Sequence, residues 1–213
     1  MLKLYYAPGT CALATHIALI DAGAEYESVR LSFKNGDQRK PDYLAINPKG
    51  RVPSLVTERG VLTETPALLV YIAQRYPKAN LAPLDDPFAL AHVQAFNNYL
   101  CSTVHVTHAH KMRGTRWVEP EDTAAIDAMK RKIPVSMMQV FELIENDMLQ
   151  GPWVMGESYT ICDPYLYTIA GWLEGDGVNM GKLPRVAAHR ARMAERPNVK
   201  RAIAEQTSEA AMA

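Results

Sequence analysis

Cys11 lies where a short strand pattern gives way to a helix pattern, directly after the turn-forming pair Pro8 and Gly9. In the first turn of a helix, free backbone N–H groups and the helix dipole stabilise a thiolate and can lower a cysteine pKa from about 8.5 to roughly 3.5–7.5. The residue three positions later is Ala14, so an internal dithiol cycle is excluded. A single activated thiol suits a mixed disulfide with a small thiol, and a buried structural cysteine is the alternative interpretation.

A second helix start could bind a charged head group. Glu64, Thr65 and Pro66 supply an outlying carboxylate, an N-cap hydroxyl and a proline suited to the first helical turn. Free N–H groups at such an end bind a carboxylate, and Glu64 could pair with an ammonium group, which together suit an amino-acid head group. An ordinary capped helix explains the same residues. Val52 precedes Pro53, which favours an extended backbone that could pair with an extended peptide.

Four histidines invite a metal interpretation: His92, His105, His108 and His110. On a helix His105 and His108 share a face, but His110 points elsewhere and no carboxylate joins them at ligand spacing. We therefore predict partly exposed or substrate-lining histidines and no metal site.

The elements that must position these residues begin with alternating strand and helix signals. Strands are predicted over residues 2–6 and 26–31, parallel to each other because a helix over residues 11–22 separates them. Residues 54–63 have the pattern of a hairpin, and a helix follows from Thr65 to before Pro77. This order predicts a small mixed sheet flanked by helices.

Helix signals alone follow a proline-rich segment at residues 77–87, which predicts a short stiff linker. Thr160 and Asp163 have the spacing of a capping box, which we interpret as a folding signal and not as catalytic residues. The fold class is thus an α/β domain over residues 1–80, a linker over residues 81–85 and an all-α domain over residues 86–213. Helices are predicted from Pro87, from near Pro120, after residues 151–156, and after Pro184 and Pro197.

Composition narrows the function classes. Of the 213 residues, 48% are apolar, and 23 Lys plus Arg balance 23 Asp plus Glu, so no nucleic-acid or membrane surface is indicated. The three cysteines lack a CxxC motif, which favours a reducing compartment. The chain starts without a charged and apolar leader and has no apolar run of bilayer length, so we expect a cytoplasmic protein.

Cys11, the Val52–Pro53 pair and the helix start at Glu64 occur in an order that resembles the glutathione transferase superfamily, most closely its bacterial beta class. The similarity spans essentially the whole chain. The segments that carry it are residues 4–14 (LYYAPGTCALA), 47–55 (NPKGRVPSL) and 63–65 (TET), then Asn98 and Tyr99 with His105, and residues 160–165 (TICDPY).

The resemblance implies a thioredoxin-like N-terminal domain that binds glutathione and a helical C-terminal domain that shapes a second-substrate site. The implied function is an enzyme, a glutathione transferase, that transfers the glutathione thiolate to an electrophilic, hydrophobic or aromatic substrate in detoxification. Glutathione is then a co-substrate, no cofactor is tightly bound, and the chain is expected to form a homodimer. The alternative is a non-catalytic protein that binds glutathione or apolar ligands.

The resemblance also implies roles for single residues. Cys11 lies beside the glutathione sulfur, Val52 binds the cysteinyl backbone next to a cis Pro53, and Glu64 with Thr65 holds the γ-glutamyl group. The other residues assigned to the glutathione site by this likeness are Lys34, Asn98, Ser102, Thr103, Val104 and His105.

Thiol activation has more than one candidate, because the chain departs from the beta-class pattern. Ala12 replaces the usual serine after the cysteine, and Val106 replaces a basic residue that often follows the histidine. Tyr6 is the nearest alternative hydroxyl, since a phenol that donates to a thiolate favours the ionised form. The candidate catalytic residues are therefore Cys11, Tyr6 and His105. An essential Cys11 favours thiol–disulfide exchange, whereas a dispensable one favours conjugation.

A basic and aromatic cluster follows the histidines. Lys111, Arg113 and Arg116 surround Trp117, as at a solvated helix end or at the mouth of a pocket that favours acidic or aromatic electrophiles. We assign Met112, Arg113 and Trp117 to the second-substrate site.

Overall fold

Four strands form one mixed sheet in the order β2–β1–β3–β4. The computed structural model describes residues 1–208, and its strands are β1 (Leu2–Tyr6), β2 (Tyr26–Arg30), β3 (Ser54–Thr57) and β4 (Gly60–Thr63). β1 pairs in parallel with β2 and antiparallel with β3, which forms a hairpin with β4. The predicted parallel pair and hairpin are both confirmed.

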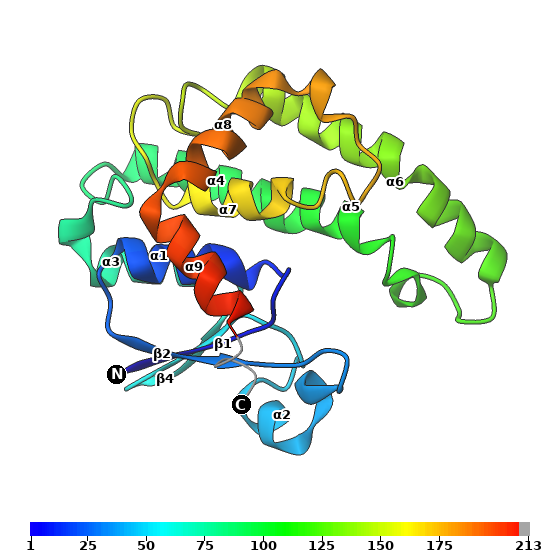
Figure 1. Cartoon of the computed structure of the whole chain (residues 1–213), viewed down its shortest axis with the longest axis horizontal. Coiled ribbons are helices and arrows are strands. Elements are labelled where there is room, and N and C mark those ends of the chain that lie inside the picture. Colours follow the sequence, from blue (N-terminus) through cyan, green and yellow to red (C-terminus); the bar gives the residue numbers. More distant parts are fainter. Residues whose placement is uncertain (209–213) are drawn as a thin grey trace.

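The side chains of β1 alternate between buried and half-buried, which shows which face of the sheet the helices cover. Leu2, Leu4 and Tyr6 are buried, whereas Lys3 and Tyr5 between them are half-buried. The helices α1 (Ala12–Asp21) and α3 (Thr65–Arg75) lie on one side of the sheet, and α2 (Pro41–Ile46) lies on the other (Figure 1). The arrangement βαβ followed by ββα is thioredoxin-like, as the resemblance implied.

Helices alone make up the rest of the described chain, so the predicted fold class is confirmed. The division of the chain at residues 81–85 stays a prediction. A π-helical turn over Leu100–Val104 joins α4 to α5, and another over Ile144–Met148 extends α6. The helices are α4 (Pro87–Tyr99), α5 (His105–Ala109), α6 (Thr123–Leu143), α7 (Cys162–Ala170), α8 (Pro184–Glu195) and α9 (Pro197–Thr207). Within residues 1–208, none of them has both the length and the apolar character needed to cross a bilayer.

One buried carboxylate fixes the start of α7. Asp163 has no exposed surface, and its Oδ2 accepts the Thr160 backbone N–H at 2.7 Å, as expected for the predicted capping box. Its Oδ1 accepts the backbone N–H of Val154 at 2.9 Å and lies 2.9 Å from His189 Nε2 of α8. Asp163 therefore ties a loop and two helices together.

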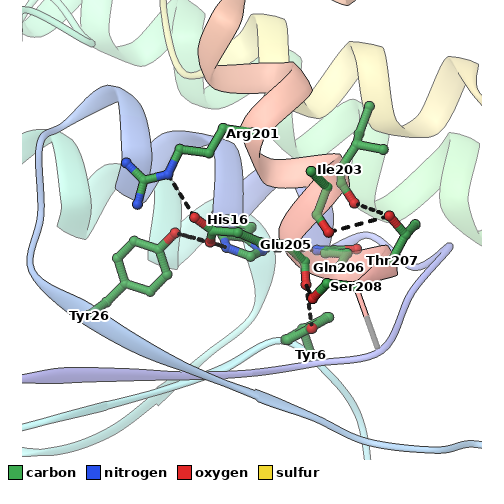
Figure 2. Close-up of polar contacts among 10 residues, drawn as sticks. Tyr6, His16, Tyr26, Arg201, Ile203, Glu205, Gln206, Thr207 and Ser208 are labelled. Atoms are coloured by element: carbon green, nitrogen blue, oxygen red, sulfur yellow. Dashed lines mark hydrogen bonds and ion pairs between the residues drawn. The ribbon is translucent and has the colours of Figure 1, made fainter. Parts of the chain in front are cut away.

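Helix α9 packs back against the α/β part of the chain. In Figure 2, Glu205 of α9 faces the His16 imidazole of α1 and the Tyr26 hydroxyl of β2. Glu205 Oε2 lies 2.8 Å from His16 Nε2 and accepts the Tyr26 hydroxyl at 2.7 Å. Gln206 Nε2 lies 3.2 Å from His16 Nδ1, so both ring nitrogens of this fully buried histidine have partners from α9. A helix near the end of the chain thus completes the packing of α1.

Candidate active site

A two-lobed cavity lies between the sheet and the helices, and Cys11 lines both lobes. The outer lobe has a volume of about 650 Å³, within the size range of small-molecule sites, and the inner lobe has about 140 Å³. Residues that line both lobes are Cys11, Arg51, Val52, His105, Ala109 and Arg116. Those of the inner lobe alone include Asn47, Pro53, Glu64, Thr65, Cys101 and Tyr165.

The N-terminus of α3 opens into the inner lobe. Its N-cap residue is Glu64, one position before the expected Thr65, and Glu64 has a φ of 73°. No side chain among residues 1–208 caps this end, so backbone N–H groups of the first turn are available to an anion. Lys49 Nζ holds the Glu64 carboxylate at 2.5 Å. The inner lobe therefore offers donors and a carboxylate within one turn of a helix.

The loop before β3 brings the backbone of Val52 beside Cys11 at the wall of the cavity. The Val52–Pro53 peptide bond is cis, as the resemblance implied. Asn47 Nδ2 donates to the Arg51 carbonyl at 2.7 Å and to Ser54 Oγ at 3.0 Å, which holds the loop in place. The Val52 carbonyl accepts the Cys11 thiol, with 3.6 Å between sulfur and oxygen. Val52 and Cys11 are therefore neighbours, as their predicted roles require.

The predicted acidification of Cys11 is wrong for the protein without ligand. Burial raises the pKa of the thiol to about 11, and a hydrogen bond with the Thr65 side chain opposes this without cancelling it. The helix begins at Ala12 and leaves Cys11 at the N-cap, only 7% exposed. Loss of hydration thus outweighs the helix end, and Cys11 is a thiol at neutral pH.

The prediction that Tyr6 activates a thiol is also wrong. Tyr6 lies on the face of β1 that is covered by helices, has no exposed surface and lines neither lobe. Its hydroxyl donates to the carbonyl of Glu205 in α9 at 3.3 Å (Figure 2). The phenol is therefore directed at α9 and not into the cavity that Cys11 lines.

His105 contributes a neutral imidazole to both lobes. Burial lowers its pKa to about 4, with further lowering by His108, Arg116 and Arg51. The ring packs edge-on against Trp172, with 5.0 Å between ring centroids. His105 is therefore unprotonated at pH 7 and stands as a hydrogen-bonding group and not as a cation.

This neutral histidine predicts a pH-dependent stability. Between pH 6.5 and 4 the unfolded chain binds a proton that folded His105 does not, so the free energy of unfolding falls as the pH falls, by at most about 1.4 kcal/mol per pH unit. Urea unfolding at pH 7, 6 and 5 should show a smaller decline for His105→Asn than for the wild type. His92→Asn, at an exposed histidine, is the control and should keep the wild-type slope. Equal slopes in all three proteins would contradict the assignment.

The predicted glutathione-site residues divide into two groups. Cys11, Val52, Pro53, Glu64, Thr65 and His105 line the inner lobe, and their roles stay predictions. Five others line neither lobe of the single chain: Lys34, Asn98, Ser102, Thr103 and Val104.

Helix geometry explains most of these five corrections. Along the continuous helix made by α4, the π-helical turn and α5, the cavity receives Cys101, His105 and Ala109, four residues apart. Val106 and His108 of the same helix also line the cavity, but Ser102 and Val104 do not: Ser102 is exposed and donates to the Asn98 carbonyl, and Val104 is fully buried. Lys34 is exposed in a turn outside the wall of the cavity.

The outer lobe combines an aromatic wall with positive charge. Trp172 Nε1 donates to the Gly9 carbonyl at 3.1 Å, and its ring stacks on His108 with centroids 4.3 Å apart. The predicted second-substrate residues Met112 and Arg113 line this lobe, and Trp117 lines the inner one. Among the described residues, no Asp or Glu lines the outer lobe. Five cations line it from both walls: Arg39, Lys49, Arg51, Arg113 and Arg116.

Several residues of the cavity were missed by the sequence analysis, notably Tyr165, Cys101 and Trp172. Tyr165 belongs to a segment that carried the family resemblance, but its spacing gave no sign that it faces Cys11. In the part of the chain that the structure describes, no group of three or more His, Cys, Asp or Glu side chains is placed to bind a metal ion.

Comparison with known proteins agrees with this geometry. Residues 1–74 match the family model "Glutathione S-transferase, N-terminal domain". Glutathione S-transferase GstA of Escherichia coli O157:H7 is 31% identical over 209 residues, which cover 95% of this chain and 97% of that protein. The chain belongs to the glutathione S-transferase family. It is therefore an enzyme of the glutathione transferase type, with glutathione as its co-substrate.

Two solved glutathione transferases show how far the likeness extends. A glutathione transferase homolog from sulfitobacter, solved with bound glutathione, is 43% identical, with a TM-score of 0.93 over 98% of this chain and 99% of its own. A bacterial beta class enzyme from Sphingomonas chungbukensis is 30% identical, with a TM-score of 0.84 over 96% and 98% of the two chains. The predicted superfamily is thus confirmed, and a beta class enzyme is among its structural relatives.

Proposed function

We propose that this transferase binds glutathione in the inner lobe and transfers its thiolate to a planar, aromatic or hydrophobic electrophile held in the outer lobe. The observation that carries the proposal is the uncapped N-terminus of α3, which opens into the inner lobe beside Glu64 and the Val52 backbone. The free N–H groups suit the α-carboxylate of the γ-glutamyl group, and Glu64 suits its ammonium. The Val52 backbone suits the cysteinyl amide.

The glutathione sulfur then lies beside Cys11, at the junction of the two lobes. In conjugation the glutathione thiol loses its proton, a sulfur–carbon bond forms, and the leaving group departs with the bonding electron pair. The stacked Trp172 and the cations of the outer lobe suit an aromatic electrophile that carries an acidic group. Exchange of glutathione disulfide through Cys11 is the second mode, and the raised pKa of this thiol disfavours it.

The glycyl carboxylate of glutathione needs a cation other than Lys34, which lies outside the cavity wall. Arg39, Lys49 and Arg51 line the wall that continues from Val52, and we propose that one of them holds this carboxylate. We further propose a cytoplasmic homodimer that detoxifies small electrophiles, as the family resemblance implied.

Replacement of Glu64 by Gln tests the proposed glutathione pose. The change keeps the shape of the side chain but removes the charge that would pair with the ammonium group, so we expect binding to weaken by about 10–100-fold. Calorimetric titration with reduced glutathione measures this directly. Glu58→Gln, at an exposed glutamate that pairs with Arg75 and lines neither lobe, should bind as the wild type does. A wild-type protein that fails to bind glutathione would overturn the proposed function itself.

A further inference from the structure

Tyr165 brings a buried hydroxyl from the helical part of the chain into the inner lobe. It is the fourth residue of α7, has no exposed surface and lines the lobe together with Cys11, Thr65 and Cys101. The Cys101 thiol is close enough to influence the Tyr165 hydroxyl, but this hydroxyl has no partner at hydrogen-bonding geometry among residues 1–208. Buried hydroxyl groups in native proteins are almost always paired, so an unpaired one at a ligand cavity indicates a partner that the ligand supplies.

The surroundings of this hydroxyl are thiols. Burial raises the pKa of Tyr165, and so do the nearby Cys11 and Cys101. The pKa of Cys101 is also raised by burial, whereas the Tyr165 hydroxyl acts to lower it. The phenol therefore lies beside both sulfur atoms and keeps its proton throughout the neutral range. Of the other titratable groups in the lobe, Glu64 raises the pKa of Tyr165, and His105 is neutral.

We propose that the Tyr165 hydroxyl donates a hydrogen bond to the sulfur of bound glutathione and thereby favours its thiolate. The inference rests on the proposed function, since it requires the glutathione sulfur beside Cys11. The thiol proton leaves to solvent, and the tyrosine keeps its own proton as the donor. Hydrogen bonding to the charged form lowers the pKa of a group, and a phenol is well suited to this because it donates without carrying charge.

Tyr165 supplies a hydroxyl that neither Tyr6 nor residue 12 provides. Tyr6 points away from the cavity, and Ala12 lacks a hydroxyl. The donor comes instead from α7, whose start is fixed by the Asp163 network, so the phenol is held by a rigid element.

The test is Tyr165→Phe, which keeps the ring and removes only the hydroxyl. We expect the pKa of bound glutathione, read from the pH dependence of kcat for an activated aryl chloride, to rise by about one unit. The rate should fall about tenfold at pH values below that pKa and approach the wild-type rate at high pH. Thiolate absorbance in difference spectra, with and without glutathione, should shift in the same way. Tyr167→Phe, on the same helix but outside both lobes, should show no shift.

A purely structural role gives different results. If the hydroxyl only supported packing, Tyr165→Phe would lower the urea midpoint of unfolding and leave the pKa of bound glutathione unchanged, which would overturn the inference. Our assignment expects an unchanged or higher midpoint, because an unpaired buried hydroxyl is removed. Repeating the comparison in a Cys11→Ala background ensures that the titrating sulfur is not Cys11. Glutathione that binds with an unshifted pKa refutes the role of Tyr165 alone, whereas absent binding refutes the proposed function.

Discussion

Cys11→Ala is expected to abolish the mixed disulfide with glutathione and to reduce conjugation by less than about tenfold, or less than about 1.4 kcal/mol of transition-state stabilisation. A thiol whose pKa is about 11 is ionised only to about one part in ten thousand at pH 7, so it is a poor nucleophile at that pH. The glutathione thiolate, and not Cys11, is then the attacking group. Mass spectrometry after incubation with glutathione disulfide, and turnover of an aryl chloride, measure the two activities separately.

Cys101→Ala is the matched control, because Cys101 also lines the inner lobe and its pKa is also raised by burial. This variant should keep the mixed disulfide on Cys11 whenever the wild type forms one. Collapse of conjugation in Cys11→Ala, with Cys101→Ala unaffected, would show that the Cys11 thiol takes part in conjugation and would refute our expectation.

Asp163→Ala should give the largest loss of stability of any single change considered. The carboxylate is completely buried and accepts the backbone N–H groups of Thr160 and Val154, while His189 Nε2 lies 2.9 Å away. Removing it leaves these groups buried without partners, and breaking such a network costs about 3–5 kcal/mol. Since small proteins are stable by about 5–15 kcal/mol, we expect a large fall in the urea midpoint.

Asp86→Ala provides the comparison for an exposed cap. Asp86 accepts hydrogen bonds from the backbone N–H groups of Phe88 and Ala89 at the start of α4, and both hydrogen bonds are exposed to solvent. Its loss should cost only about 1 kcal/mol. Equal losses in the two variants would mean that burial of Asp163 adds nothing to its effect.

Much of the fold could be predicted because it rests on local patterns. The alternation in residues 2–6 and the turn at Glu58–Gly60 gave the strands, and prolines at positions 66, 87, 184 and 197 marked helix starts that the structure confirms. These signals depend on neighbours in sequence, which a single chain displays. The π-helical turn at Leu100–Val104 has no such signal, and it helps decide which residues of that helix reach the cavity.

The sequence predicted only those residues of the site whose positions are set by the secondary structure of their own segment. Val52, Pro53, Glu64 and Thr65 lie in the lobe because a strand end and a helix start bring them there. The pKa of Cys11 could not be predicted, since its burial depends on helices far along the chain. The role of Tyr165 could not be predicted for the same reason, because its hydroxyl lies near Cys11 only through the packing of α7 against α1.

The contact between α9 and α1 sets an order of events during synthesis. His16 and Glu205 are separated by 189 residues, so at about 5–20 residues per second a ribosome delivers Glu205 roughly ten to forty seconds after His16. Throughout that time the imidazole of the emerging first domain lacks both of its α9 partners. The sheet and α1 therefore reach their final packing only after α9 has left the ribosome, and a nascent chain stopped before α9 exposes this surface to chaperones and proteases.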